Sequence, residues 1–305
     1  MSKHNRRRIQ TGPQAVLPVT DGARQWMSGG VLIDVLMPVY GEWTLAEKAY
    51  ESIAPAMEGV AEEYRVYIVD NGTPEWVNQQ GQSVSALQQA LALRQKMRPQ
   101  DMFRRLEKNI GYPGAVNEAA KHGRAPLILV WTSDVTMTPG SIAHLVRAMD
   151  DPTVGICGAK FLFPLDESPH GPAGKVQHAG MAINIKGDPI HQFIGWSSDN
   201  PRVNQRCEVD IVTGALFITR RSLWEKFGGM DLAYGMGTYE DLDFCMKVRE
   251  VGSKVLYEPA ALGYHYVGGS IKKGAGKQGF NLPLNATLFR GRWAHRLAWS
   301  EWKRW

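Results

Sequence analysis

The chain has 305 residues, of which 44% are hydrophobic and 21% are charged, and this balance excludes a disordered, collagen-like or fibrous protein. Its three cysteines lie far apart without a C-x-x-C pair, which argues against a disulfide framework and a cysteine-rich zinc site. The net charge of +5 arises at two basic ends, because the part between them carries more acidic than basic residues. We interpret these ends either as solvated tails or as segments that attract a phosphate-rich partner, such as nucleic acid or an anionic lipid surface.

The length exceeds the usual domain of roughly 100 to 150 residues and fits one larger α/β domain with appendages. We predict a basic extension over residues 1–30, a single domain over 31–270, and a basic, tryptophan-rich extension over 271–305. No run approaches the ~18 consecutive apolar residues of a membrane helix, and the N-terminus lacks the apolar stretch of a secretory signal. We therefore expect a soluble, unexported protein with a cytoplasmic location.

Strand-like and helix-like segments alternate four times in the first half of the chain. The predicted strands cover residues 31–39, 64–70, 102–107 and 126–132. The predicted helices cover residues 44–56, 84–97, 113–121 and 139–149. This alternation predicts an α/β fold in which parallel strands are joined by right-handed crossovers and ligands gather at the carboxyl ends of the strands.

From about residue 154 the pattern changes to short strand-like segments separated by Gly and Pro. The predicted strands here cover residues 154–163, 176–185, 208–219 and 254–257, and the predicted helices cover 221–227 and 240–251. No linker-like stretch separates the two halves. We therefore predict a mixed sheet that is built onto the first half within one domain.

Polar residues follow three of the predicted strands at the edge where such a sheet binds ligands. Pro38 and Tyr40 lie at the end of the first strand, Asp70 ends the second, and Asp134 follows the fourth. A carboxylate in such a place accepts hydrogen bonds from a base or a ribose, and beside a metal ion it helps to hold a diphosphate. The Asn-Gly pair that follows Asp70 also has a purely structural interpretation as a turn.

Several short motifs occur in a fixed order along the chain: Pro38-Val-Tyr40, Val69-Asp-Asn-Gly72, Asn109-Ile-Gly-Tyr-Pro-Gly-Ala-Val-Asn117, Ser133-Asp-Val135, Val209-Asp-Ile-Val-Thr-Gly-Ala215, Gly228-Gly-Met-Asp231, Glu240-Asp-Leu-Asp-Phe-Cys245 and His265-Tyr-Val-Gly-Gly-Ser270. Each motif is weak alone, but their order is specific, and it resembles the family 2 glycosyltransferases with the GT-A fold. The likeness is closest to the branch usually called rhamnosyltransferase-like. With Asn285, Phe289 and Trp293 it covers about residues 31–293.

The resemblance implies transfer of a sugar from a nucleotide donor, usually a UDP- or dTDP-sugar, with inversion at the anomeric carbon. Residues 31–150 would form a Rossmann-like half that binds the nucleotide-sugar, fused to a mixed-sheet half over 151–270 for the acceptor and catalysis. The residues implied at the nucleotide are Pro38, Tyr40, Asp70, Asn71, Gly111, Gly114, Asn117, Ser133 and Asp134. Asp70 would accept the imide hydrogen of the base. The two glycines would let the backbone approach the nucleoside, or would simply form a structural turn. Asn109 and Asn117 would contact the ribose or be structural.

A divalent metal ion, Mn²⁺ or Mg²⁺, is also implied by the resemblance, with Asp134 as its carboxylate ligand. Here the sequence departs from the family pattern, because Ser133-Asp134-Val135 offers one carboxylate instead of two. Both ions favour oxygen ligands and complete their shell with diphosphate oxygens and water, so one acid is sufficient. The resemblance makes His265 the second protein ligand.

Glu240 and Asp241 are the implied catalytic pair, at the start of a predicted helix. Acidic residues in a first helical turn are also favoured by the helix dipole alone, which is the structural alternative. The chemistry needs a carboxylate that takes the proton of the acceptor hydroxyl as the new bond forms. By resemblance Asp241 is this base, while Glu240 and Asp243 orient the site, and a base at Glu240 is the alternative assignment.

On the acceptor side we place Thr213, Gly214 and Ala215, whose small size leaves room for a hydroxyl-bearing group, and also Asp243. Trp196, with His191 nearby, is a candidate for stacking on an acceptor ring, and an ordinary core or rim aromatic is the equal alternative. The segment 291–305 has the pattern of a basic amphipathic helix. It would dock on the domain, lie on an anionic membrane or contact nucleic acid phosphates.

Three functions are consistent with these features. The leading hypothesis is a glycosyltransferase that acts on a glycan or lipid-linked glycan. A second keeps the donor chemistry but makes the acceptor a hydroxymethylated base in DNA, which the two basic ends favour. A third, supported by the shortened metal motif, is an inactive module that binds sugar nucleotides or nucleic acid. A nucleotidylyltransferase is disfavoured because no Gly-rich phosphate loop follows the first strand.

Overall fold

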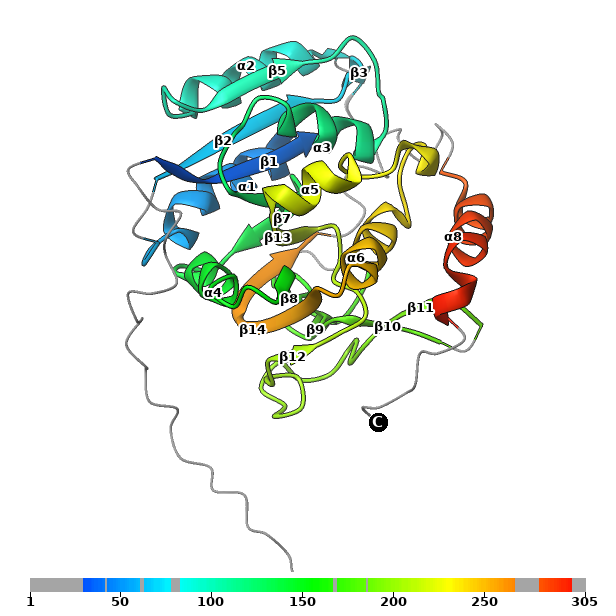
Figure 1. The fold of residues 1–305 in the computed structure, drawn as a ribbon. Helices are drawn as coiled ribbons and strands as arrows, with labels where there is room; N and C mark the ends of the chain where they lie inside the picture. Colours follow the sequence, from blue (N-terminus) through cyan, green and yellow to red (C-terminus); the bar gives the residue numbers. More distant parts are fainter. Residues whose placement is uncertain are drawn as a thin grey trace, which may run out of the picture.

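The computed structural model describes residues 30–41, 43–60, 63–77, 83–166, 169–184, 186–266 and 280–297 (Figure 1). The predicted N-terminal extension, apart from its last residue, therefore lies outside the described residues. The last three tryptophans, at positions 299, 302 and 305, also lie outside them. No helix in the described ranges is both long and apolar enough to cross a membrane.

The first half forms the predicted alternation of strands and helices. Strand β1 (Val31–Val39) lies between β2 (Glu63–Asp70) and β6 (Leu127–Trp131), and β5 (Met102–Arg105) is next to β2, with all these pairs parallel. The helices of this half are α1 (Trp43–Ala56), α2 (Ala86–Lys96), α3 (Tyr112–Ala120) and α4 (Ser141–Ala148). The central strands read as continuous apolar runs because helices cover both faces of the sheet.

The second half continues the same sheet. Strand β13 (Leu216–Arg220) is antiparallel to both β6 and β8 (Val154–Leu162), and β14 (Lys254–His265) is parallel to β8. The short strand β12 (Cys207–Glu208) pairs with β14, so the strand order is β12-β14-β8-β13-β6-β1-β2-β5. The mixed sheet of the GT-A type that we predicted is confirmed, and it runs through both halves without a break.

Two predicted strands are divided in the structure. The segment 176–185 forms β9 (Val176–His178) and β10 (Met181–Ile183), because Gly180 between them has φ +83° and turns the chain. Strand β10 then pairs with β11 (Pro189–His191) as a hairpin. The segment 208–219 likewise divides into β12 and β13, with irregular backbone between them. A further small pair joins β3 (Trp76–Val77) and β4 (Ser83–Val84).

Strand β14 is much longer than the predicted 254–257. Pro259 interrupts the apolar pattern and has no N–H to donate to a sheet, so the sequence predicts that the strand ends there. In the structure this position is only an irregularity in the register between Glu258 and Leu262. Beyond it the strand continues and pairs with β7 (Val135–Met137), opposing His265 to Val135. This continuation brings His265 to the end of the loop that carries Asp134.

Two apolar clusters fill the space on either side of the sheet. One contains residues of α1, α2 and α4, including Trp43, Leu93 and Leu145. The other contains residues of α3, α5 (Arg221–Phe227), α6 (Glu240–Glu250) and α8 (Leu282–Leu297), including Phe244, Phe289 and Trp293. Figure 1 shows α8, in red, beside α6, in gold. The described part of the C-terminal segment is thus a helix that packs on the domain, and it begins earlier than the predicted 291.

Candidate active site

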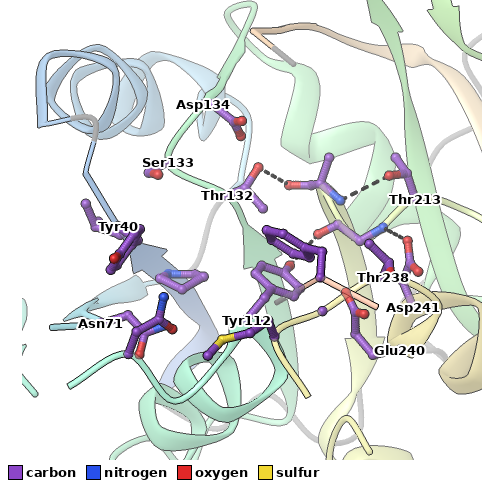
Figure 2. A pocket seen from close by; sticks show the side chains of 18 of the residues that line it. Tyr40, Asn71, Tyr112, Thr132, Ser133, Asp134, Thr213, Thr238, Glu240 and Asp241 are labelled. Carbon is purple, nitrogen blue, oxygen red and sulfur yellow. Dashed lines mark hydrogen bonds between the residues drawn. The ribbon is translucent and has the colours of Figure 1, made fainter. Parts of the chain in front are cut away.

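A cavity of about 320 Å³ opens at the carboxyl ends of β1, β2 and β6. The N-terminus of α3 and the start of α6 complete its wall. Figure 2 shows Tyr40 and Asn71 on one side of it, Glu240 and Asp241 on another, and Asp134 apart from both. The predicted site residues that line this cavity are Pro38, Tyr40, Asn71, Ser133, Asp134, Thr213, Gly214, Glu240, Asp241 and His265. Residues from distant parts of the chain therefore meet in one space.

Glu240 and Asp241 are the acidic pair at the start of α6. The Asp241 carboxylate accepts the N–H of Gly214 at 2.7 Å and the N–H of Leu242 at 2.9 Å. Glu240 is only 5% exposed, and its Oε2 has no hydrogen-bond partner among the described residues. Burial raises the pKa of Glu240 well above its usual value, and the adjacent Asp241 adds to this effect. Burial also raises the pKa of Asp241, although its two N–H donors favour the charged form.

The backbone of Gly214 is held on both sides at the cavity wall. Its N–H donates to Asp241, and its carbonyl accepts the hydroxyl of Tyr112 at 2.6 Å. The N–H of Thr213 donates to Nε2 of His178 at 3.4 Å. A Cβ at Gly214 would lie 3.0 Å from Cβ of Asp241, so the missing side chain is what lets α6 approach.

Asp134 and His265 form the second polar centre of the cavity. Their Oδ1 and Nε2 atoms are 3.6 Å apart, and both side chains are largely buried. Burial acts to raise the pKa of Asp134, but His265 and hydrogen bonds outweigh it and hold that pKa below its usual value. On the other side of the ring, Nδ1 of His265 lies 3.4 Å from Oε1 of Gln177. One carboxylate oxygen and one imidazole nitrogen facing a cavity are a suitable pair of donors for Mn²⁺, although no group of three or more such donors occurs within the described ranges.

Asn71 and Asp70 differ in position although they are neighbours. Asn71 lines the cavity, and its side-chain oxygen holds the loop between β5 and α3 by accepting the N–H of Ile110 at 2.9 Å. Asp70 is fully buried and is not among the lining residues; its carboxylate accepts the N–H and hydroxyl of Thr73 and pairs with Arg105. In the structure Asp70 therefore supports the edge of the sheet, and its contact with a base stays a prediction.

Three other residues that we expected to bind the nucleotide do not line the cavity and instead contact other parts of the protein. Gly111 has φ +81°, and a Cβ there would lie 2.1 Å from the carbonyl oxygen of Gly235, so the close neighbour at this glycine is backbone. Gly114 lies inside α3 against Ile110. Asn117 donates to the carbonyl of Met230 and accepts its N–H. These contacts support the structural alternatives that we considered for these positions.

Two residues expected on the acceptor side are also absent from the cavity lining. Asp243 is fully buried and accepts from Arg292 and Trp293 of α8, at 2.8 and 2.9 Å. Trp196 is 39% exposed and packs edge-on against Phe193 in the loop after β11. Asp243 thus connects two helices, while stacking of Trp196 on an acceptor stays a prediction.

Residues 34–227 match the model of the family described as Glycosyl transferase family 2, which is more than half of the chain. The chain belongs to this family. A curated relative, Uncharacterized protein y4gI of Sinorhizobium fredii (strain NBRC 101917 / NGR234), is 24% identical over 251 residues, which cover 79% of this chain and 25% of that protein. O-antigen biosynthesis protein RfbC of Myxococcus xanthus is 29% identical over 153 residues, which cover 48% of this chain and 11% of that protein. The chain therefore spans a quarter or less of the length of these relatives.

Two solved structures share the fold of this chain. The crystal structure of GalNAc-T7 with UDP, GalNAc and Mn²⁺ has a TM-score of 0.59 and 15% identity, over 77% of this chain and 44% of that one. Mannosyltransferase PcManGT from Pyrobaculum calidifontis, in complex with GDP-Man and Mn²⁺, has a TM-score of 0.53 and 16% identity, over 80% of this chain and 62% of that one. At these identities the likeness establishes the fold.

Sequence reasoning missed several residues of the glycosyltransferase cavity. Tyr112 lies in the Asn109–Asn117 motif, but its hydroxyl bond to Gly214 spans 102 positions and has no local signal. Thr238 lies two positions before Glu240, so its proximity in sequence was a usable signal. The other lining residues that we did not predict are Val39, Thr132, Met236, Gly237 and Phe280. Asn109, which we expected to be structural or to contact the ribose, and Ala215, which we placed on the acceptor side, also line the cavity.

Proposed function

We propose that this glycosyltransferase transfers a sugar, with inversion, from a UDP- or dTDP-sugar to a hydroxyl group of a glycan or lipid-linked glycan. The observation that carries the proposal is that Asp241 and Asp134 line the same cavity. Inversion requires a single displacement, so a base for the acceptor and stabilisation of the leaving group must act together. The two carboxylates occupy positions suited to these two tasks.

Asp241 is the proposed base. It takes the proton of the acceptor hydroxyl as that oxygen bonds to the anomeric carbon and the bond to the leaving diphosphate breaks. The N–H groups of Gly214 and Leu242 favour its ionised form. Burial and the adjacent charge of Asp241 raise the pKa of Glu240 and favour its protonated form, and its Oε2 has no hydrogen-bond partner among the described residues, so it is free to meet a substrate in the cavity.

Asp134 and His265 are the proposed protein ligands of a divalent cation. Such an ion would stabilise the negative charge that develops on the departing diphosphate. The structure of GalNAc-T7 with UDP, GalNAc and Mn²⁺ and that of PcManGT with GDP-Man and Mn²⁺ support this cofactor. Because Asp134 holds a lowered pKa despite burial, it is ionised at neutral pH and ready to bind a cation.

The acceptor and the branch of the family are proposed on weaker likeness. The likeness to RfbC, an O-antigen biosynthesis protein, supports a cell-surface glycan as acceptor and the rhamnosyltransferase-like branch. Thr213, Gly214 and Trp196 are the proposed acceptor-side residues. The hexosyltransferase subclass and a cytoplasmic location remain part of this proposal.

A donor and acceptor screen tests the proposed function. The full chain is incubated with UDP-, dTDP- and GDP-sugars, with Mn²⁺ or with EDTA, and release of nucleoside diphosphate is measured alone, with glycan acceptors and with hydroxymethylated DNA. We expect metal-dependent release with one uracil or thymine donor, increased by a glycan acceptor. If only hydroxymethylated DNA increased the release of nucleoside diphosphate, DNA would replace the glycan as the proposed acceptor. If no donor were turned over, an inactive binding module would be favoured.

A further inference from the structure

The turn that precedes the catalytic pair has an unusual backbone. Thr238 and Tyr239 are consecutive residues with φ of 75° and 74°, in the left-handed region that side chains other than glycine rarely adopt. Such conformations persist only where the surrounding structure holds them. Because Tyr239 directly precedes Glu240, the dihedral angles of this turn set the direction in which Glu240 and Asp241 enter the cavity.

A single side chain of α8 binds this turn from behind. Nδ2 of Asn285 lies 3.0 Å from the carbonyl oxygen of Tyr234, 2.8 Å from that of Gly237 and 3.0 Å from that of Thr238. The hydroxyl oxygen of Thr238 lies 3.1 Å away as well. Asn285 is 3% exposed, so its two N–H groups are the donors that meet this group of oxygens away from bulk solvent.

Helix α8 makes further contacts both before and after the Glu240–Asp241 pair. The rings of Phe289 and Tyr239 are 5.5 Å apart. Further along α8, Arg292 and Trp293 bind the buried carboxylate of Asp243. Helix α8 is therefore fixed both to the turn before Glu240 and to α6 just after Asp241, and Asn285 is its polar contact with the strained turn.

We propose that Asn285 is a positioning residue for the transfer reaction. Its amide holds the turn 234–239 in the left-handed conformation that directs Glu240 and Asp241 into the cavity. The inference rests on the proposed role of Asp241. Asn285 does not line the cavity, so its effect on the reaction passes through the backbone of the turn.

The substitution Asn285→Asp is the sharpest test, because it keeps the shape of the side chain but replaces its donors with a negative charge among several oxygen acceptors. Asn281→Asp is the matched control on the same helix. There the side-chain oxygen caps the N–H of Leu284 at 3.1 Å, a bond that Asp preserves. Asn285→Ala removes the donors without adding a charge, and serves if Asn285→Asp does not fold.

We expect Asn285→Asp to lower kcat on the order of 100-fold, since a shift of about 1 Å in a catalytic group has such an effect. The donor Kd should change less than about threefold, because Tyr40 and Asn71 are not disturbed. Asn281→Asp should retain the kcat of the wild type. A kcat within about twofold of the wild type in folded Asn285→Asp and Asn285→Ala would overturn the proposal, and so would parallel losses of kcat and donor binding.

Hydrogen exchange separates this inference from the proposed function. Amides of residues 235–242 should exchange at least about tenfold faster in Asn285→Asp than in the wild type, whether or not a donor has been found. Unchanged exchange in residues 235–242 would refute the positioning role of Asn285, even if the enzyme transfers sugar. Retention of transfer by Asp241→Asn would instead refute the proposed role of Asp241 as the base.

Discussion

Buried carboxylates occur in two different settings in this molecule. In the supporting structure each is matched by a basic residue: Asp34 pairs with Arg221 at 2.5 Å, Asp70 with Arg105, and Asp243 with Arg292 at 2.8 Å. At the start of α6, Glu240 is buried and the adjacent Asp241 is partly buried, and both line the cavity. Among the residues that the structure describes, neither of these two has a basic partner.

The difference between paired and unpaired carboxylates indicates where the fold tolerates the cost of burying an acidic group that can take part in chemistry. Burial raises the pKa of Asp34 and Asp70 as well, but in each case an arginine and a backbone N–H oppose it. Glu240 has the charge of Asp241 beside it instead, which raises its pKa further. Proton transfer needs a carboxylate that can accept a proton, and an ion pair with a basic residue would hold that carboxylate in its ionised form.

The largest expected effect is on transfer in Asp241→Asn. This change removes the proton acceptor and little volume, so we expect kcat to fall about 10²- to 10⁴-fold with donor binding nearly intact. The free energy of unfolding should change by less than about 1 kcal/mol, since no ion pair is lost. Steady-state kinetics, donor titration and urea unfolding measure these quantities. Glu250→Gln, at the other end of α6, is the control, and equal losses of binding and rate would show that the role is misassigned.

The same substitution at a paired carboxylate should have the opposite profile. Asp34→Asn leaves the buried guanidinium of Arg221 without its counter-charge, so we expect the free energy of unfolding to fall by about 3 kcal/mol or more. At temperatures where the variant is folded, kcat should match the wild type. Urea unfolding of Asp34→Asn and Asp241→Asn measures the two free energies of unfolding. Equal losses in both variants would contradict the distinction between paired and unpaired carboxylates.

A pair of histidines extends the comparison to bases. Nε2 of His178 accepts the N–H groups of Gly180 and Thr213, so its Nδ1 carries the hydrogen that is shared with Nδ1 of His191 at 3.2 Å. Burial, with the nearby His265, lowers the pKa of His191 from 6.5 to about 4. Between these values the unfolded chain binds more protons than the folded one, so stability is lost as pH falls from about 6.5 towards 4.

The variant His191→Asn isolates this contribution, because its amide oxygen still accepts from His178 but does not titrate. We expect the wild type to lose about 1–2 kcal/mol more of its free energy of unfolding than the variant between pH 7 and pH 5. Urea unfolding at these pH values is the measurement. Identical losses in the two proteins would contradict the neutral histidine pair.

The smallest expected effect is that of a single methyl group beside the base. The Cβ of Gly214→Ala would lie 3.0 Å from Cβ and 3.2 Å from Oδ2 of Asp241, so Asp241 must shift by a few tenths of an ångström. We expect kcat to fall roughly tenfold, about 1.4 kcal/mol in the activation barrier. Gly291→Ala on α8, where no atom lies within 4 Å of the added carbon, is the control. An unchanged kcat in Gly214→Ala would show that the approach is not restrictive.

Much of the fold was predictable because its signals are local. Apolar runs indicated β1, β6 and β8, and the turn residues between them indicated where they end. The strand β14 was predicted too short, since Pro259 breaks the pattern while pairing with β8 continues beyond it. The order of motifs was enough to predict that Asp134, Asp241 and His265 belong to one site, and they line one cavity.

The amino-acid sequence by itself determined which segments are strands and helices and which acidic residues follow them, because burial and backbone geometry repeat over a few positions. Only the tertiary structure decided which of those acids are compensated. Arg221 meets Asp34 across 187 positions, and Asn285 meets the turn before Glu240 across about 50. Such contacts depend on how helices pack on a completed sheet, and no local periodicity encodes that geometry.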